Sequence, residues 1–251
     1  MNEELLAKGR KLAEEIALSL GPPRFYMEKE REVDISHRVF GEDPLIRKGL
    51  QIMEASAGSY GHGLAHAQKV AVDAGAIIIN ESPSSEGREY PKRLLLLSHL
   101  AGLFHDIKRS SPNHAQAGAE EAETILKDFD ITEYERRAVR NAIRNHEAFQ
   151  LHEKIDDPFV KLLSDALYDA DKFRWGPDNF TEMLWDIVIP LDVPLKKLLE
   201  HFMPGMKGIE KIGKTFRTLT GKEYGPDFID RGLKTGYRLY EALNTDEFLK
   251  D

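Results

Sequence analysis

Apolar residues recur at the spacing of an α-helix along almost the whole chain, and this pattern limits the fold more than any other feature of the sequence. Leu5, Leu12, Ile16 and Leu20 lie on one such stripe, which stops at Gly21-Pro22-Pro23. No stretch shows sustained alternation of period two, and no Asn-Gly or Asp-Gly hairpin turn occurs. The sequence therefore predicts an all-α fold of about ten helices.

Local signals predict where several helices begin. Three dipeptides join a capping residue to a proline suited to the first helical position: Asp43-Pro44, Ser111-Pro112 and Asp157-Pro158. Thr132 and Glu135 have the spacing of a capping box. Residues 62–79 and 94–105 are also helical in pattern, and residues 82–90 form the clearest loop.

Composition narrows the class of protein. The 251 residues carry a net charge of −8, which argues against a general nucleic-acid binder. The chain contains no cysteine, which excludes disulfides, thiolate zinc sites, iron–sulfur clusters and cysteine nucleophiles. The first residues lack the pattern of a signal peptide, and the longest apolar runs are too short to cross a bilayer. We expect a soluble cytoplasmic protein with no membrane partner.

The histidines are concentrated in the middle of the chain. Seven of the nine lie within residues 62–152, about a third of the sequence. Carboxylates also lie at the ends of helical segments. The pair His105-Asp106 follows the apolar segment 94–104, and Asp171 lies near the end of another segment. A charged pair ending a buried helix is costly unless it is paired or binds a cation. Imidazoles and carboxylates that converge from several helices form a nitrogen and oxygen metal site.

Three sequence elements resemble the HD superfamily of metal-dependent phosphohydrolases, over roughly residues 58–175. They are His66-Ala67-Gln68-Lys69-Val70, His105-Asp106-Ile107-Lys108-Arg109 and Ala170-Asp171-Lys172. The resemblance implies an HD-domain helical bundle with additional N- and C-terminal helices. It also implies the metal ligands His66, His105, Asp106 and Asp171.

The resemblance extends to a second metal position. HD proteins with two metals add histidines where this chain has His114 and His146. His146 stands alone where the branch that hydrolyses cyclic di-GMP has a His-His pair, and the Gly-Tyr-Pro signature of that branch is missing. The cofactor is therefore one or two divalent ions (Mn, Fe, Co, Ni, Zn or Mg), which Asp106 would bridge if there are two.

The implied activity is hydrolysis of a phosphate mono- or diester of a small substrate, most plausibly a nucleotide, by metal-activated water. A metal held by imidazole and carboxylate lowers the pKa of bound water to roughly 7–9. His62, one turn before His66, is a candidate to protonate the leaving oxygen or to bind the phosphate. Lys108 and Arg109 are candidates to clamp the phosphate.

Other interpretations stay open at several residues. His114 and His146 are also explained as hydrogen-bonded histidines at helix ends. Lys108 and Arg109 are also explained as cations that offset a helix dipole. Asp169 competes with Asp171 as the ligand, and the Ala-Asp-Lys match favours Asp171.

Two alternative functions remain. One is a catalytically weak HD-fold module that senses a nucleotide or contacts a protein partner through its C-terminal helices. The other is a P-loop switch, because residues 208–215 fit Gly-x4-Gly-Lys-Thr, but the preceding segment is helical in pattern where a P-loop requires a strand. For the chain as a whole we expect N-terminal helices over 1–57, the metal-binding core over 58–175 and a C-terminal helical region over 176–251, in one continuous domain.

Overall fold

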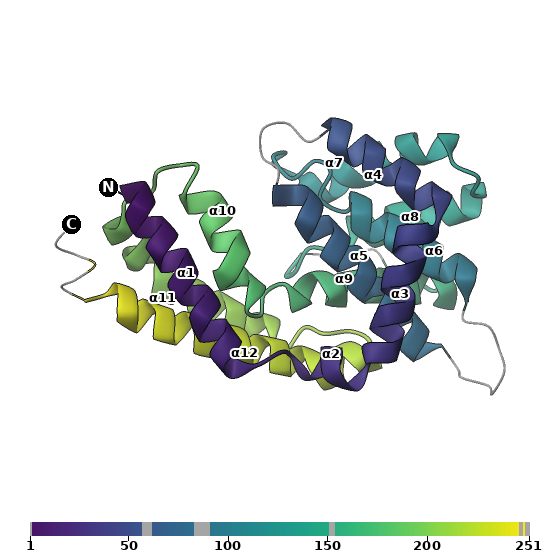
Figure 1. The fold of residues 1–251 in the computed structure, drawn as a ribbon. Coiled ribbons are helices and arrows are strands. Elements are labelled where there is room, and N and C mark those ends of the chain that lie inside the picture. Colours follow the sequence, from purple (N-terminus) through teal and green to yellow (C-terminus); the bar gives the residue numbers. More distant parts are fainter. Residues whose placement is uncertain (1, 57–61, 83–90, 151–153, 246–247, 249–251) are drawn as a thin grey trace. The chain divides into compact units, whose positions relative to one another are not determined.

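The fold is all-α, as the sequence predicts. A computed structural model describes residues 2–56, 62–82, 91–150, 154–245 and 248, without the side chains of residues 2, 56 and 62. All regular structure in these segments is helical, and it forms twelve α-helices with one 3₁₀ turn and one π-helical turn (Figure 1). None of the described helices is both long enough and apolar enough for a membrane span.

The chain divides into two compact units. One unit comprises residues 28–171 together with residues 216–223. The other comprises residues 1–27, 172–215 and 224–251. The division falls inside three helices, α2 (Arg24–Glu28), α9 (Pro158–Phe173) and α12 (Leu219–Leu243), so each of them contributes residues to both units.

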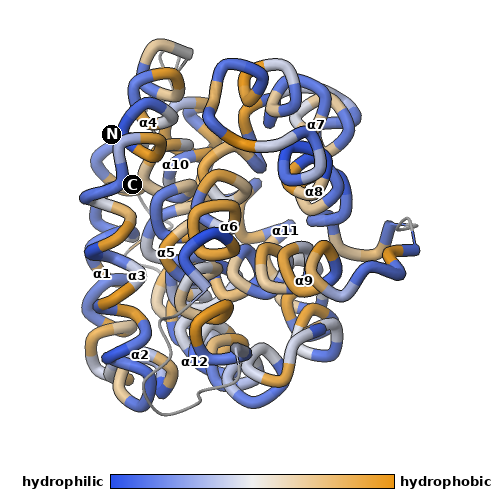
Figure 2. The backbone as a smooth tube through the Cα atoms, turned by 90° about the vertical axis from the view of Figure 1, so that its right-hand side faces the viewer, coloured by the Kyte–Doolittle hydropathy of each residue, from blue (hydrophilic) through white to orange (hydrophobic). Residues whose placement is uncertain are grey.

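The unit of residues 28–171 holds most of the histidines. Its remaining elements are α3 (Glu30–Glu42), α4 (Pro44–Ser56), α5 (His62–Glu81), α6 (Lys92–Phe104), α7 (His114–Ile125), the 3₁₀ turn η1 (Leu126–Asp128) and α8 (Glu133–Arg144). Helices α5 and α6 pack against each other, α3 and α4 cover them, and α7 pairs with α8. Hydrophobic residues recur along α5 and α6 (Figure 2).

Helix α6 forms the centre of this unit. Each of its residues from Leu94 to Phe104 is buried, so the helix presents no solvent-facing side over this length. Gly102 brings α6 against α5, because a Cβ at this position would overlap the backbone of Ala71. The chain leaves this buried helix directly at His105, which is itself fully buried.

Three of the four predicted helix starts are confirmed. The carboxylates of Asp43 and Asp157 cap α4 and α9, with Asp43 Oδ1 accepting from Leu45 N at 2.8 Å. Thr132 and Glu135 form both bonds of the capping box that begins α8. The start predicted at Ser111-Pro112 is wrong, because α7 begins at His114. Residues 104–111 form successive turns, and the first i→i−4 hydrogen bond of α7 runs from Ala117 N to Asn113 O, so Asn113 and not Ser111 is the N-cap residue.

The other unit contains α1 (Asn2–Leu20), α2 (Arg24–Glu28, to residue 27), the π-helical turn η2 (Asn179–Met183), α10 (Leu184–Val188), α11 (Leu195–Ile212) and most of α12. Trp185 is its largest fully buried side chain, and the indole N–H donates to Phe180 O. The rings of Phe173 and Phe228 stack with centroids 4.1 Å apart. The count exceeds the expected ten helices because α2 and α10 have only five residues each, too few to show a period.

The segment that fits the P-loop expression has no strand before it. Residues 208–212 are the last turn of α11, and residues 213–215 follow as a turn. A P-loop presents its amides to phosphate from a loop between a strand and a helix. In α11 the amides up to Ile212 lie within a helix, so this segment has a different geometry.

Candidate metal centre

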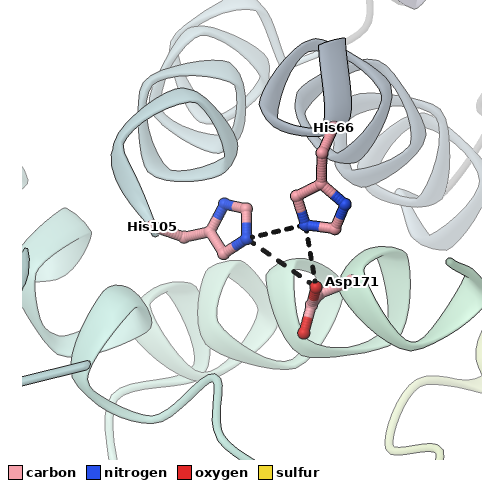
Figure 3. A group of neighbouring side chains, drawn as sticks. All are labelled: His66, His105 and Asp171. Carbon is pink, nitrogen blue, oxygen red and sulfur yellow. Dashed lines mark hydrogen bonds and ion pairs between the residues drawn. The ribbon is translucent and has the colours of Figure 1, made fainter. Parts of the chain in front are cut away.

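His66, His105 and Asp171 come together from three helices. His66 lies on α5, His105 follows the last residue of α6, and Asp171 lies on α9 (Figure 3). Nε2 of His66 is 3.2 Å from Nε2 of His105 and 3.3 Å from Oδ1 of Asp171. Nε2 of His105 is 3.7 Å from the same carboxylate oxygen. These three residues can hold a metal ion, and we call them the first group.

Further side chains that can bind metal lie beside the first group. His105, Asp106 and His146 offer ligand atoms within 4.8 Å of one another. Oδ2 of Asp106 lies 3.6 Å from Nε2 of His105, whereas Oδ1 lies 3.5 Å from Nε2 of His146. His114, the first residue of α7, places its Nε2 3.6 Å from the same Oδ1. The Asp106 carboxylate thus faces His105 with one oxygen and His114 and His146 with the other. We call Asp106, His114 and His146 the second group.

The backbone fixes the orientation of two imidazoles. Nδ1 of His105 lies 2.7 Å from Gly102 O, and Nδ1 of His146 lies 2.6 Å from Ile143 O. A carbonyl oxygen only accepts, so both Nδ1 atoms carry the hydrogen. In the neutral rings Nε2 is then an unprotonated acceptor directed at the carboxylates. This is the arrangement in which proteins present histidine to a metal.

The donor set fits a divalent cation. Two ligand atoms about 2.0–2.2 Å from one ion are roughly 3.0–3.5 Å apart at angles of about 90–110°. The separations within the two groups run from 3.2 to 3.7 Å. Oδ1 of Asp106 is buried and accepts no hydrogen bond from any group in the described residues. Such an atom is costly unless a cation lies nearby; the Arg109 guanidinium, 3.5 Å away, is one such cation, and a metal ion would be another.

Burial and nearby charges favour the protonation states in which these side chains bind metal. Burial lowers the pKa of His105 to about 4, although Asp106 and Asp171 oppose this effect. Burial also lowers the pKa of His114. For Asp106 burial raises the pKa, but His105, His146 and Arg109 outweigh it and hold the pKa well below the usual value. Neutral imidazoles and an ionised carboxylate are the forms that bind metal.

Asp169 has a different role from Asp171. Its Oδ1 accepts from Arg217 N at 2.9 Å, and its Oδ2 accepts from Thr218 N at 2.8 Å. These bonds hold the residues just before α12, whose first residue is Leu219. Burial raises the pKa of Asp169 to about 6. Asp171, two residues later on α9, therefore supplies the carboxylate of the first group.

Lys108 and Arg109, the two residues predicted to bind phosphate, contact different neighbours. Lys108 Nζ lies 3.4 Å from Oε2 of Glu121 on α7. Arg109 Nη1 lies 3.1 Å from Nε2 of His114 and 3.5 Å from Oδ1 of Asp106, within the second group. The side chain of His62, predicted to be catalytic, lies outside the described part of the structure, as does all of His152.

Glu147 was not predicted to take part in the site. Its Oε1 lies 2.8 Å from Nδ1 of His114, which fixes the ring as the backbone carbonyls fix His105 and His146. The only sequence signal is that Glu147 directly follows His146. That adjacency does not show that the carboxylate contacts His114, which lies 33 positions earlier as the first residue of α7.

No family model, curated protein or solved structure matches this chain. We therefore interpret the two groups from the chemistry of their own side chains.

Proposed function

We propose that this protein is a metal-dependent phosphohydrolase that cleaves a phosphate mono- or diester of a nucleotide. The observation that carries the proposal is the convergence of acceptor atoms on two adjoining positions. His66, His105 and Asp171 surround one position. Asp106 and His146 meet His105 at the other, where Nε2 of His114 also lies 3.6 Å from Oδ1 of Asp106. The class of substrate follows from the resemblance to HD phosphohydrolases, which the three sequence elements carry.

Each residue has a defined part in this activity. His66, His105 and Asp171 would hold the first ion, and Asp106 would be shared between it and the position next to His114 and His146. A bound divalent cation supplies Lewis acidity, which activates water and neutralises charge on a phosphoryl oxygen.

The site is open to solvent, and so to a substrate, at its less buried ligands. His66, Asp106 and His114 are 15–17% exposed at their side chains, whereas His105 and His146 are almost completely enclosed. Arg109, on the same side as His114, is exposed enough to meet a phosphate and bind it bidentately.

The test measures bound metal and hydrolysis together on the full chain. Wild type, Asp106→Asn and Asp171→Asn are analysed for metal by elemental analysis after loading with Mn²⁺. Each is then assayed on a panel of phosphomonoesters, phosphodiesters and nucleotides. Asp230→Asn, an exposed carboxylate that pairs with Lys234, is the control for loss of one negative charge.

We expect wild type and Asp230→Asn to bind metal and to hydrolyse at least one panel member. Both site variants should lose bound metal and reduce the rate by roughly 10²-fold or more, because several kcal/mol of transition-state stabilisation depend on the ion. Metal binding without hydrolysis of any panel member would favour the nucleotide-sensing alternative. Absence of metal from wild type under every loading condition would contradict the proposal.

A further inference from the structure

Arg109 places a positive charge on atoms that a second metal ion would use. Its Nη1 is within hydrogen-bonding distance, 3.1 Å, of Nε2 of His114. The same nitrogen is 3.5 Å from Oδ1 of Asp106, the buried oxygen that also faces His146 at 3.5 Å. The guanidinium thus contacts two of the three residues of the second group.

The contact with His114 excludes an ion from the same nitrogen. Nδ1 of His114 lies 2.8 Å from the Glu147 carboxylate, which only accepts, so Nδ1 carries the hydrogen. Nε2 of the neutral ring then has a single lone pair, and Arg109 donates to it. One lone pair serves one partner, so Arg109 and a metal ion cannot both bind His114.

The charge of Arg109 strengthens this competition. A guanidinium stays protonated throughout the pH range of folded proteins, so its repulsion of a divalent ion is permanent while it remains there. The Arg109 side chain is 63% exposed, and it can leave the second group without unpacking the core. A phosphate is the partner most suited to attract it, because a guanidinium binds two phosphate oxygens at once.

We propose that Arg109 and the second metal ion compete for His114 and Asp106, and that a phosphate group releases these ligands by drawing Arg109 away. The first ion binds independently of Arg109, whereas the second binds tightly only together with phosphate. This regulation rests on the proposed function, because it assumes that the two groups bind metal.

The experiment compares wild type with Arg109→Gln. Binding of Mn²⁺ to the full metal-free chain is followed by titration calorimetry, with and without inorganic phosphate. Electron paramagnetic resonance of the same samples detects the coupled signal of two neighbouring Mn²⁺ ions. Arg137→Gln, which removes an exposed arginine of α8 paired with Glu133, controls for the change in net charge.

We expect wild type and Arg137→Gln to bind the first Mn²⁺ alike and the second about tenfold more tightly when phosphate is present, a coupling of ordinary size. Arg109→Gln should keep the affinity of the first ion, which also shows that it is folded. It should bind the second about tenfold more tightly than wild type without phosphate, and phosphate should add little.

Two results would overturn the inference, and they are distinguishable. If Arg109→Gln binds the first ion normally but the second no more tightly than wild type does, Arg109 does not compete, and the proposed metal centre stands. If neither wild type nor the variant binds Mn²⁺ at all, the proposed function fails and this regulation fails with it.

Discussion

Carbonyl oxygens and carboxylates of the chain decide which nitrogen of each histidine faces the site. Gly102 O and Ile143 O hold the hydrogens of His105 and His146 on Nδ1, and Glu147 does the same for His114. The carbonyl contacts belong to helix ends, so they form whenever α6 and α8 fold. The Glu147 contact depends on one side chain and can be removed without changing a ligand.

Substituting Glu147 should therefore affect one metal position and not the other. In Glu147→Gln the carboxylate that fixes His114 becomes an amide, which can also present a donor to Nδ1 and favour the other tautomer. We expect the affinity for the second Mn²⁺, measured by titration calorimetry with phosphate present, to fall about 10–100-fold. The affinity for the first should stay unchanged.

Glu133→Gln is the matched control, because Glu133 is exposed and forms an ion pair with Arg137 on its own helix. Equal weakening of both ions by Glu147→Gln would show that Glu147 supports the whole site and not His114 alone.

At the level of the helices, two hydrogen bonds of Ser36 join α3 to α5 and α6. Ser36 Oγ donates to Val72 O at 2.7 Å and accepts from Nε2 of His99 at 2.9 Å. Nδ1 of His99 accepts no hydrogen bond within the described residues, and the edge of Phe40 lies nearby. Burial lowers the pKa of His99 to about 3, so the folded state holds the ring neutral.

This depressed pKa predicts sensitivity to acid. Between pH 6.5, the ordinary value of the unfolded state, and about 3, the unfolded chain binds a proton at His99 that the folded chain does not. The stability contribution is present above pH 6.5 and falls as the pH is lowered. We expect the free energy of unfolding of the metal-free protein, from urea denaturation, to lose about 2 kcal/mol from this group between pH 7 and 5.

His99→Leu should remove that part of the loss and leave the part due to other groups, such as His105. The comparison uses the difference between the two pH values within each variant, so a general destabilisation of His99→Leu does not affect it. An identical pH dependence in wild type and variant would contradict a neutral buried His99.

The sequence predicts elements better than it predicts contacts between them. Helix starts at Asp43, Asp157 and Thr132 follow from bonds within a few residues, and the structure contains them. Ser111-Pro112 has the same local signal, but the turns after α6 continue through Ser111, and Asn113 is the N-cap residue of α7. Local chemistry is visible in a sequence, whereas competition from a neighbouring segment is visible only in the fold.

The same distinction applies to the site. The candidate ligands were implied by the resemblance of three sequence elements to the HD superfamily, and the structure brings six of them together. The contacts of Glu147 with His114 and of Arg109 with the second group could not be predicted, because they join side chains across turns and separate helices. The Ala-Asp-Lys match already favours Asp171 over Asp169, and the fold adds the physical reason, because the backbone amides of Arg217 and Thr218 bind Asp169 from a distant segment.

At the scale of the whole molecule, the ligands are far apart in the chain. They extend from His66 to Asp171, and all belong to the unit of residues 28–171 and 216–223. The unfolded chain cannot hold these ligands at one point, so an ion binds the folded state preferentially. Metal binding and folding are then linked.

We therefore expect Mn²⁺ to raise the melting temperature. At about 100 times its Kd, an ion adds about 2.7 kcal/mol of stability, which corresponds to roughly 5–10 °C for a domain of this size. Scanning calorimetry with added Mn²⁺ or chelator measures the shift. Asp106→Asn should lose most of the increase and Asp230→Asn should keep it, whereas an equal increase in both would point to binding elsewhere.

Gly102 connects the packing of two helices to the chemistry between them. It allows α6 to lie directly against Ala71 of α5, and its carbonyl oxygen orients His105. His66 is on α5 and His105 follows α6, so the distance between these two nitrogens is determined by how closely the helices approach. The absence of one methyl group at position 102 thus lets α5 and α6 approach closely enough for the two histidines to face each other.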